Sequence, residues 1–144
     1  MKVLVIDDDQ DVRSLISDAL KTSGIECVCA GNAKEAVARF LEGDIGMITL
    51  DIKMPWLSGT ELHRIFSQEF GAGRRTRGFS VKKLPYILVV TGYPDNKAVV
   101  KLLSRESVVG VLAKPFDVKL LIDIAKDTLA RAEADALNRK ANHS

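Results

Sequence analysis

Five polar residues stand where short apolar stretches of the chain end, and their types could support chemistry. They are Asp7, Asp8, Asp51, Thr91 and Lys114. Carboxylates that are held close together cannot all stay ionised without a counter-charge. Their oxygens suit a hard cation, and Mg²⁺ typically takes one or two carboxylates while it keeps positions for water and a phosphoryl group. The set therefore predicts a divalent-cation site that handles phosphoryl groups.

The reaction that fits this set is transfer of a phosphoryl group to a carboxylate. One carboxylate can attack phosphorus and form an acyl phosphate, while a bound cation neutralises the charge that develops. A lysine and a hydroxyl on the opposite side can hold the remaining phosphoryl oxygens. This chemistry requires five side chains, which are spread over most of the sequence, to meet at one place.

The elements that must position these residues alternate along the chain. Apolar, β-branched stretches predict strands at 3–6, 47–50, 86–90 and 108–113, and an alternating pattern predicts another at 26–30. Apolar residues at helical spacing predict helices near 12–20, 36–41, 62–70, 98–103 and 117–138. Such alternation implies a parallel sheet with helices on both faces. The carboxyl ends of parallel strands all lie at one edge of the sheet, which is where functional sites form. Four of the predicted strands end in the five polar residues, so we expect these residues to meet at that edge. The second strand ends at Ala30 and Gly31, as an edge strand outside the site would.

Composition limits the remaining possibilities. A chain of 144 residues that is 47% hydrophobic predicts one core and a single domain. Its apolar runs fall far short of the roughly 20 residues that span a bilayer, and its start lacks the features of a signal peptide. Cys27 and Cys29 alternate on one strand, which predicts core thiols in a reducing compartment. We expect a soluble cytoplasmic domain without membrane insertion.

Positive charge is concentrated in one segment. Residues 74–83 contain five cations and no acid, although the whole chain carries a formal net charge of only +2. The remainder of the chain is therefore net acidic, which argues against direct nucleic-acid binding. Glycines and cations predict an exposed loop at 71–83; a solvated loop and a dedicated binding patch remain as alternatives for its role.

Four segments carry a resemblance to a known family. In chain order they are VLVIDDDQDVR, MITLDIKMPWLSG, ILVVTGY and VLAKPF. The chain resembles the receiver domain of bacterial two-component response regulators, in the stand-alone, chemotaxis-regulator-like form. The resemblance extends from Lys2 to about Leu129 and implies a flavodoxin-like doubly wound α/β fold, with a five-stranded parallel sheet of order 2-1-3-4-5 and five helices. It implies a receiver domain over 1–130, followed by an extended C-terminal helix and tail over 131–144.

The resemblance also assigns the acidic residues. Asp51 would be the phosphoacceptor and a ligand of Mg²⁺, or of Mn²⁺ in its place. Asp8 would bind the cation directly, and Asp7 mainly through metal-bound water. The backbone carbonyl of Lys53 would complete the protein ligands.

Two further residues receive roles from the same resemblance. Thr91 would bind the phosphoryl group and change position on activation. Lys114 would pair with the phosphoryl group or with the unmodified carboxylate, and a cis peptide would join it to Pro115. Three positions before this lysine the family commonly has an aromatic residue, which turns in or out with the state of the threonine. This chain has Val111 there, a stiff and small side chain.

Partners follow from the resemblance as well. A sensor histidine kinase or histidine phosphotransfer protein would phosphorylate the domain, and a downstream protein would detect the change. The domain would assist its own phosphotransfer and dephosphorylation without being an enzyme with a catalytic output. The alanine-rich tail leaves three alternatives, namely a frayed extension, a homodimer contact and the start of a linker.

Two other functions stay open as alternatives. A degenerate receiver would bind proteins without phosphorylation, but all five expected site residues are present. The pair Asp7-x-Asp9 after a strand also opens haloacid-dehalogenase-type phosphatases, which need Thr or Val where Asp11 stands and a late acidic pair that this chain lacks. A simpler role for Asp9 or Asp11 is to cap the following helix.

Overall fold

The computed structural model describes residues 1–51, 53–54, 57–58, 75–76, 79–80, 85–95, 97–103 and 106–142. The elements in chain order are β1 (Lys2–Ile6), α1 (Gln10–Thr22), β2 (Cys27–Ala30), α2 (Ala33–Leu41), β3 (Ile45–Leu50), β4 (Lys53–Met54), β5 (Leu57–Ser58), β6 (Arg75–Thr76), β7 (Phe79–Ser80), β8 (Tyr86–Thr91), α4 (Lys97–Leu103), β9 (Val108–Ala113) and α5 (Val118–Asn142).

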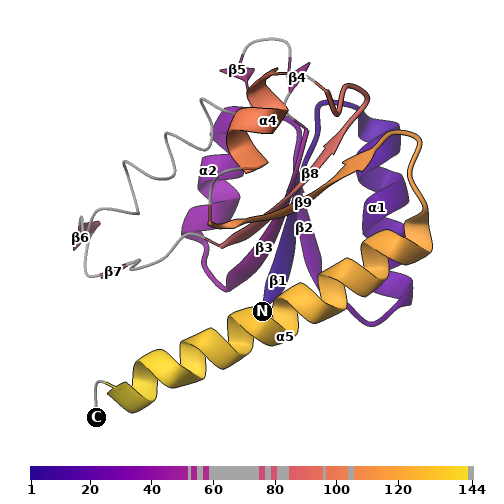
Figure 1. The fold of residues 1–144 in the computed structure, drawn as a ribbon. Helices are drawn as coiled ribbons and strands as arrows, with labels where there is room; N and C mark the ends of the chain where they lie inside the picture. Colours follow the sequence, from indigo (N-terminus) through magenta and orange to yellow (C-terminus); the bar gives the residue numbers. More distant parts are fainter. Residues whose placement is uncertain are drawn as a thin grey trace.

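The main sheet has five strands in the order β2-β1-β3-β8-β9, and all neighbouring pairs are parallel. Figure 1 shows α1 and α5 on one side of this sheet and α2 and α4 on the other. This arrangement confirms the predicted doubly wound fold and the strand order 2-1-3-4-5. The helix expected near 62–70 lies outside the described residues.

Two apolar layers hold the helices to the sheet. Alternate residues of each central strand face opposite sides, so Val5 packs with α1 and α5 while Leu4 packs with α2 and α4. Strands β1, β3 and β8 are almost completely buried, as continuous apolar runs predict for parallel strands covered on both faces. Cys27 and Cys29 are free, half-buried and packed on the α1 and α5 side, in agreement with their alternate spacing.

Helix starts next to the site are fixed by side-chain caps. Asp9 is the N-cap of α1, and its carboxylate accepts a hydrogen bond from the Asp11 N–H at 2.9 Å. Asn32 caps α2 by accepting from the Glu35 N–H at 2.7 Å. The Asp9 cap agrees with the sequence prediction, and each of the two caps satisfies a backbone donor that lacks a partner in the first turn of a helix.

Helix α5 extends beyond the predicted end near residue 138, to Asn142. The Tyr86 hydroxyl donates a hydrogen bond to the Asp135 carboxylate, and the Arg131 guanidinium lies 4.7 Å from the centre of the Tyr86 ring. Ala132 is buried, whereas Leu137 is 67% exposed. Contacts between α5 and the body therefore continue past residue 130, and the proposed division at that residue stays a prediction.

The basic segment contains a short antiparallel ladder where the sequence predicts an irregular loop. Strands β6 and β7 pair Arg75 with Ser80 and Thr76 with Phe79. The other basic residues of the segment, and both histidines, lie outside the described residues. None of the helices in the described part of the chain combines the length and the apolar character that a membrane crossing requires.

Candidate metal centre

Strand register places the two buried acids next to each other. Strands β1 and β3 pair Ile6 with Leu50, and each of these residues is followed by an aspartate. The Asp51 N–H donates to the Ile6 carbonyl at 3.0 Å, which continues the ladder to the end of both strands. Asp7 and Asp51 therefore stand side by side at the carboxyl edge of the sheet.

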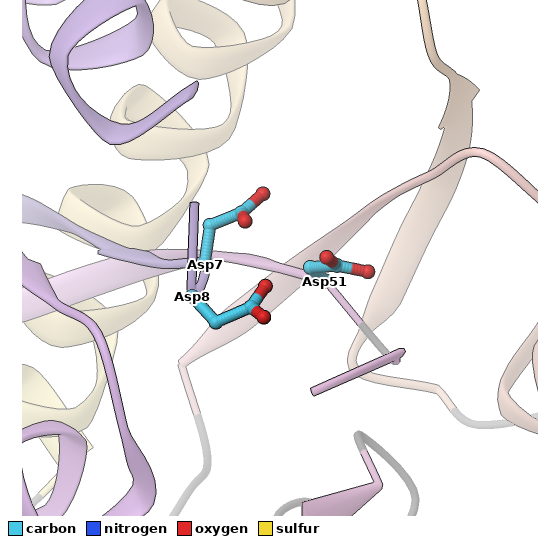
Figure 2. Close-up of side chains that lie close together, drawn as sticks. All are labelled: Asp7, Asp8 and Asp51. Atoms are coloured by element: carbon cyan, nitrogen blue, oxygen red, sulfur yellow. The ribbon is translucent and has the colours of Figure 1, made fainter. Parts of the chain in front are cut away.

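Three carboxylates meet at this edge. One oxygen from each of Asp7, Asp8 and Asp51 lies within 4.8 Å of the others, and Figure 2 shows the three side chains close together, with the Asp8 carboxylate extending toward Asp51. Asp7 and Asp51 are 2% and 7% exposed, while Asp8 is exposed to solvent. An all-oxygen cluster with one open side suits a hard cation that keeps some of its water, which is the preference of Mg²⁺. The residues therefore fit the metal that the sequence predicts.

Lys114 supplies positive charge to the buried pair. Its Nζ lies 2.7 Å from Asp7 Oδ2 and 3.3 Å from Asp51 Oδ2, and its side chain is 22% exposed. The Lys114 N–H donates to the Thr91 carbonyl at 2.7 Å, which ties the end of β9 to the end of β8. The peptide bond between Lys114 and Pro115 is cis, as expected. The structure thus joins Lys114 to the unmodified carboxylate.

Burial dominates the protonation of Asp7. Desolvation raises the pKa of its carboxyl and the Asp51 charge adds to the rise, against hydrogen bonds from Lys114 and from the Asp9 N–H. For Lys114, burial alone would lower the pKa, but the hydrogen bond to Asp7 and the charges of Asp51 and Asp7 outweigh burial and raise it. Burial thus opposes the ionised form of Asp7 even with Lys114 beside it.

Thr91 and Lys53, the two other residues predicted for the site, have local contacts of their own. Thr91 is fully buried at the end of β8, and its Oγ1 accepts a hydrogen bond from the Tyr93 N–H at 3.1 Å. Lys53 begins β4 and pairs with Ser58. The phosphoryl contact of Thr91 and the metal contact of the Lys53 carbonyl stay predictions.

One residue that touches the site was not singled out by sequence patterns. The Arg13 side chain reaches from α1 and donates through Nη1 to the Asp7 carbonyl at 2.7 Å. An arginine in the first turns of an amphipathic helix is ordinarily a solvated residue, so its type and spacing give no signal. Only the position of α1 over the ends of β1 and β2 reveals the contact.

Comparison with known proteins agrees with this geometry. A protein-family model described as the response regulator receiver domain matches residues 3–126. The phosphate regulon transcriptional regulatory protein PhoB of Pseudomonas aeruginosa is 29% identical over 130 residues, which cover 90% of this chain and 52% of that protein. The chain thus spans about half the length of PhoB, and the match to FleR of the same organism covers 23% of that protein.

Two solved structures share the fold. The response regulator TrrA from Thermotoga maritima, solved in complex with Mg²⁺-BeF, is 26% identical with a TM-score of 0.68, over 89% of this chain and 99% of that chain. A CheY-like receiver domain protein from Methanospirillum hungatei is 23% identical with a TM-score of 0.76, over 93% of this chain and 97% of that one. With the family match over most of its length, this chain belongs to the response regulator receiver domain family of two-component signalling.

Proposed function

We propose that this domain accepts a phosphoryl group on Asp51 from a sensor histidine kinase or a histidine phosphotransfer protein, in a reaction that needs Mg²⁺. The observation that carries the proposal is the meeting of Asp7, Asp8 and Asp51 with Lys114 bonded to the Asp51 carboxylate. The proposal includes a cytoplasmic location, where two-component receivers meet their kinases, and no direct contact with nucleic acid.

In the proposed transfer, a carboxylate oxygen of Asp51 attacks the phosphorus of a phosphohistidine. The new O–P bond forms as the N–P bond breaks, and the electron pair of that bond returns to the imidazole. Asp51 suits this role because it directly follows the buried strand β3 and lies close to Asp8, whose side chain is exposed to solvent. Lys114 is already within reach of Asp51 and can bind a phosphoryl oxygen without a large movement.

Asp7, Asp8, Asp51 and the carbonyl of Lys53 would hold the cation. A bound Mg²⁺, or Mn²⁺ in its place, neutralises negative charge on the phosphoryl oxygens. The chain's own contribution is to bring carboxylates together and to leave Asp8 facing solvent, where a phosphodonor approaches. Lys114 balances part of the charge of Asp7 and Asp51 before the cation binds.

Thr91 would connect the site with a partner. Its hydroxyl now accepts from the Tyr93 N–H, so binding a phosphoryl group would exchange this local contact for one with the site. Thr91 lies at the end of β8, before α4, and α4 with the start of α5 exposes Val100, Leu103 and Leu120 at 59%, 47% and 46%. A downstream protein is the proposed reader of this face, and a second copy of the chain is the alternative occupant.

The competing phosphatase hypothesis loses support from Asp9. That carboxylate caps α1, so it is engaged with the Asp11 backbone. In a phosphatase of the haloacid-dehalogenase type the same residue would have to take part in catalysis.

Labelling by acetyl phosphate in the presence of Mg²⁺ tests the proposal. Asp51→Asn keeps the shape of the side chain but removes the nucleophile, so the mass increase of a phosphoryl group should disappear. Asp8→Ala should also abolish labelling, because it removes a metal ligand. Undiminished labelling of Asp51→Asn would sink the assignment; labelling at Asp7 would favour the phosphatase, and no labelling of the unmodified chain would favour a degenerate receiver.

A further inference from the structure

Arg13 holds the backbone between two of the clustered acids. It is a half-buried residue of α1, and its Nη1 donates to the Asp7 carbonyl at 2.7 Å. That carbonyl belongs to the peptide group that joins Asp7 to Asp8. Because a peptide group is planar, a strong donor on its oxygen fixes the plane from which the chain continues into Asp8. A residue outside the carboxylate cluster therefore orients two of its members.

The space that the Arg13 guanidinium occupies is left free by Gly31. The register of β1 and β2 runs to Ile6 and Ala30, so the next position brings Asp7 opposite Gly31. A Cβ on Gly31 would lie only 2.7 Å from Arg13 Nη1 and 3.2 Å from Cζ.

The backbone of Gly31 would accept a side chain. Among the described glycines, those with positive φ are Gly24 and Gly43, so Gly31 has no conformation that an alanine would avoid. The close approach of the guanidinium is thus the structural reason for glycine at this position. Substitution of Gly31 should displace the end of Arg13 and leave the strand intact.

The positive charge of Arg13 opposes cation binding, whereas its hydrogen bond to the Asp7 carbonyl favours it. A guanidinium stays protonated at all relevant pH values, and a fixed cation close to a metal site opposes the binding of a second cation. Loss of the Arg13 charge should by itself strengthen Mg²⁺ binding. A weaker affinity after its removal therefore indicates lost geometry and not the lost charge.

We propose that Arg13 is a positioning residue of the metal site, which holds the peptide group between Asp7 and Asp8 so that both carboxylates face Asp51, and that Gly31 provides the space for its guanidinium. The inference rests on the proposed function, since it concerns the cation that Asp51 phosphorylation requires. The contact occurs where the ladder between β1 and β2 ends, so Arg13 acts as a side-chain donor where the strand pairing stops.

Three variants separate geometry from charge. Arg13→Met removes the donor and the charge but keeps the length of the side chain. Arg13→Lys keeps the charge with a single donor group. Gly31→Ala keeps both Arg13 and its charge and displaces the guanidinium. Two matched controls lie away from the site: Arg39→Met on α2, where Arg39 pairs with Glu42 on the surface, and Gly110→Ala on β9, where a Cβ would meet its nearest atom at 3.9 Å.

Titration of the metal-free proteins with Mg²⁺, followed by ¹H–¹⁵N NMR, measures the dissociation constant directly and needs no phosphorylation. We expect the Kd of Arg13→Met and Gly31→Ala to rise roughly 10-fold, the lower end of what loss of an outer partner of a metal ligand costs. Arg13→Lys should restore part of the affinity, and both controls should bind as the unmodified chain does. The midpoint of urea unfolding, measured in parallel, shows how much of each change is a general loss of stability.

The result that would overturn the inference is an unchanged or tighter Kd in both Arg13→Met and Gly31→Ala. A lower unfolding midpoint with the same Kd would likewise assign Arg13 a purely structural role. If Arg13→Met does not fold, Gly31→Ala alone decides. A failure of the unmodified chain to bind Mg²⁺ would instead overturn the proposed function and this inference with it, so the two failures are distinguishable.

Discussion

At the scale of single residues, the buried carboxylate of Asp7 lowers the stability of the folded protein. Asp7 is buried and its pKa is raised, which means that desolvation of the carboxylate outweighs the stabilisation that its hydrogen bonds and the Lys114 charge give to the ionised form. When a carboxyl has a higher pKa in the folded than in the unfolded state, the folded state binds more protons between these two values. The protonated Asp7 carboxyl therefore stabilises the fold below its ordinary pKa of 3.8, and this stabilisation is lost as pH rises through the folded pKa. At neutral pH the Asp7 charge destabilises the fold.

We predict that Asp7→Asn stabilises the metal-free protein at pH 7. The amide keeps an acceptor for the Asp9 N–H, and Lys114 keeps Asp51 as a partner. The gain should be about 1 kcal/mol, a common size for a single substitution, and should shrink toward zero as pH falls to the unfolded pKa. Urea unfolding in a chelator at pH 7 and pH 4 measures it, with the exposed Asp18→Asn as control. An equal or lower stability of Asp7→Asn at pH 7 would contradict the prediction.

The same scale shows what sequence could and could not predict about the site. Types and strand-end positions correctly indicated that Asp7, Asp8, Asp51 and Lys114 come together, because parallel strands bring their carboxyl ends to one edge. They did not indicate Arg13, because its contact is with a backbone oxygen. A backbone acceptor leaves no pattern of side-chain types in the sequence.

At the scale of elements, apolar runs predicted every strand of the main sheet, while helix details depended on tertiary contacts. Leu15 belongs to the apolar stripe of α1 yet is 50% exposed. Successive helical residues are about 100° apart, so a stripe that is wide in sequence can extend past the strip that meets the sheet. The end of α5 was also placed too early, at about residue 138 in place of Asn142, because apolar spacing does not fix the last turn of a helix.

We predict that a phosphoryl mimic changes amide exchange most in α4, β9 and the first turns of α5. Thr91 ends β8, so any movement of its hydroxyl toward Asp51 affects the segment before α4 first. Coupling of this kind is typically about 1–3 kcal/mol. The lower part of that range is expected, since Val111 has little surface to reorient. Exchange with and without beryllofluoride and Mg²⁺ measures the effect. Changes confined to the site, or found chiefly in α1, would show that the output face is misassigned.

At the scale of the whole molecule, charge is divided unevenly. The carboxyl edge of the sheet concentrates acids, whereas residues 74–83 carry five cations, of which Arg75 lies in β6. Exposed charges separated by more than about 8 Å are largely screened at physiological salt. We expect the basic segment, which its composition predicts to be an exposed loop, to act independently of the metal site and of the core.

We expect Arg74, Arg75 and Arg77 to belong to a solvated loop, so their replacement by Ser should change the free energy of unfolding by less than about 0.5 kcal/mol. The rate of phosphotransfer from a kinase should also stay unchanged. Urea unfolding and stopped-flow transfer at two salt concentrations test both statements. A slower association that loses its salt dependence would instead identify the segment as a docking patch for an acidic partner.

Helix α5 is held along most of its length like a clamped beam. Its 25 residues correspond to about 37 Å, and it starts just after Lys114, at the edge that carries the acids, and ends beyond the opposite edge of the sheet. Its first turns are buried against the sheet at Leu121, Ala125 and Leu129. Tyr86 holds the helix again later in its length, through Arg131 and Asp135. A helix clamped in this way cannot swing freely at its site end, so we expect a shift that begins near Lys114 either to move α5 as one body or to leave it in place.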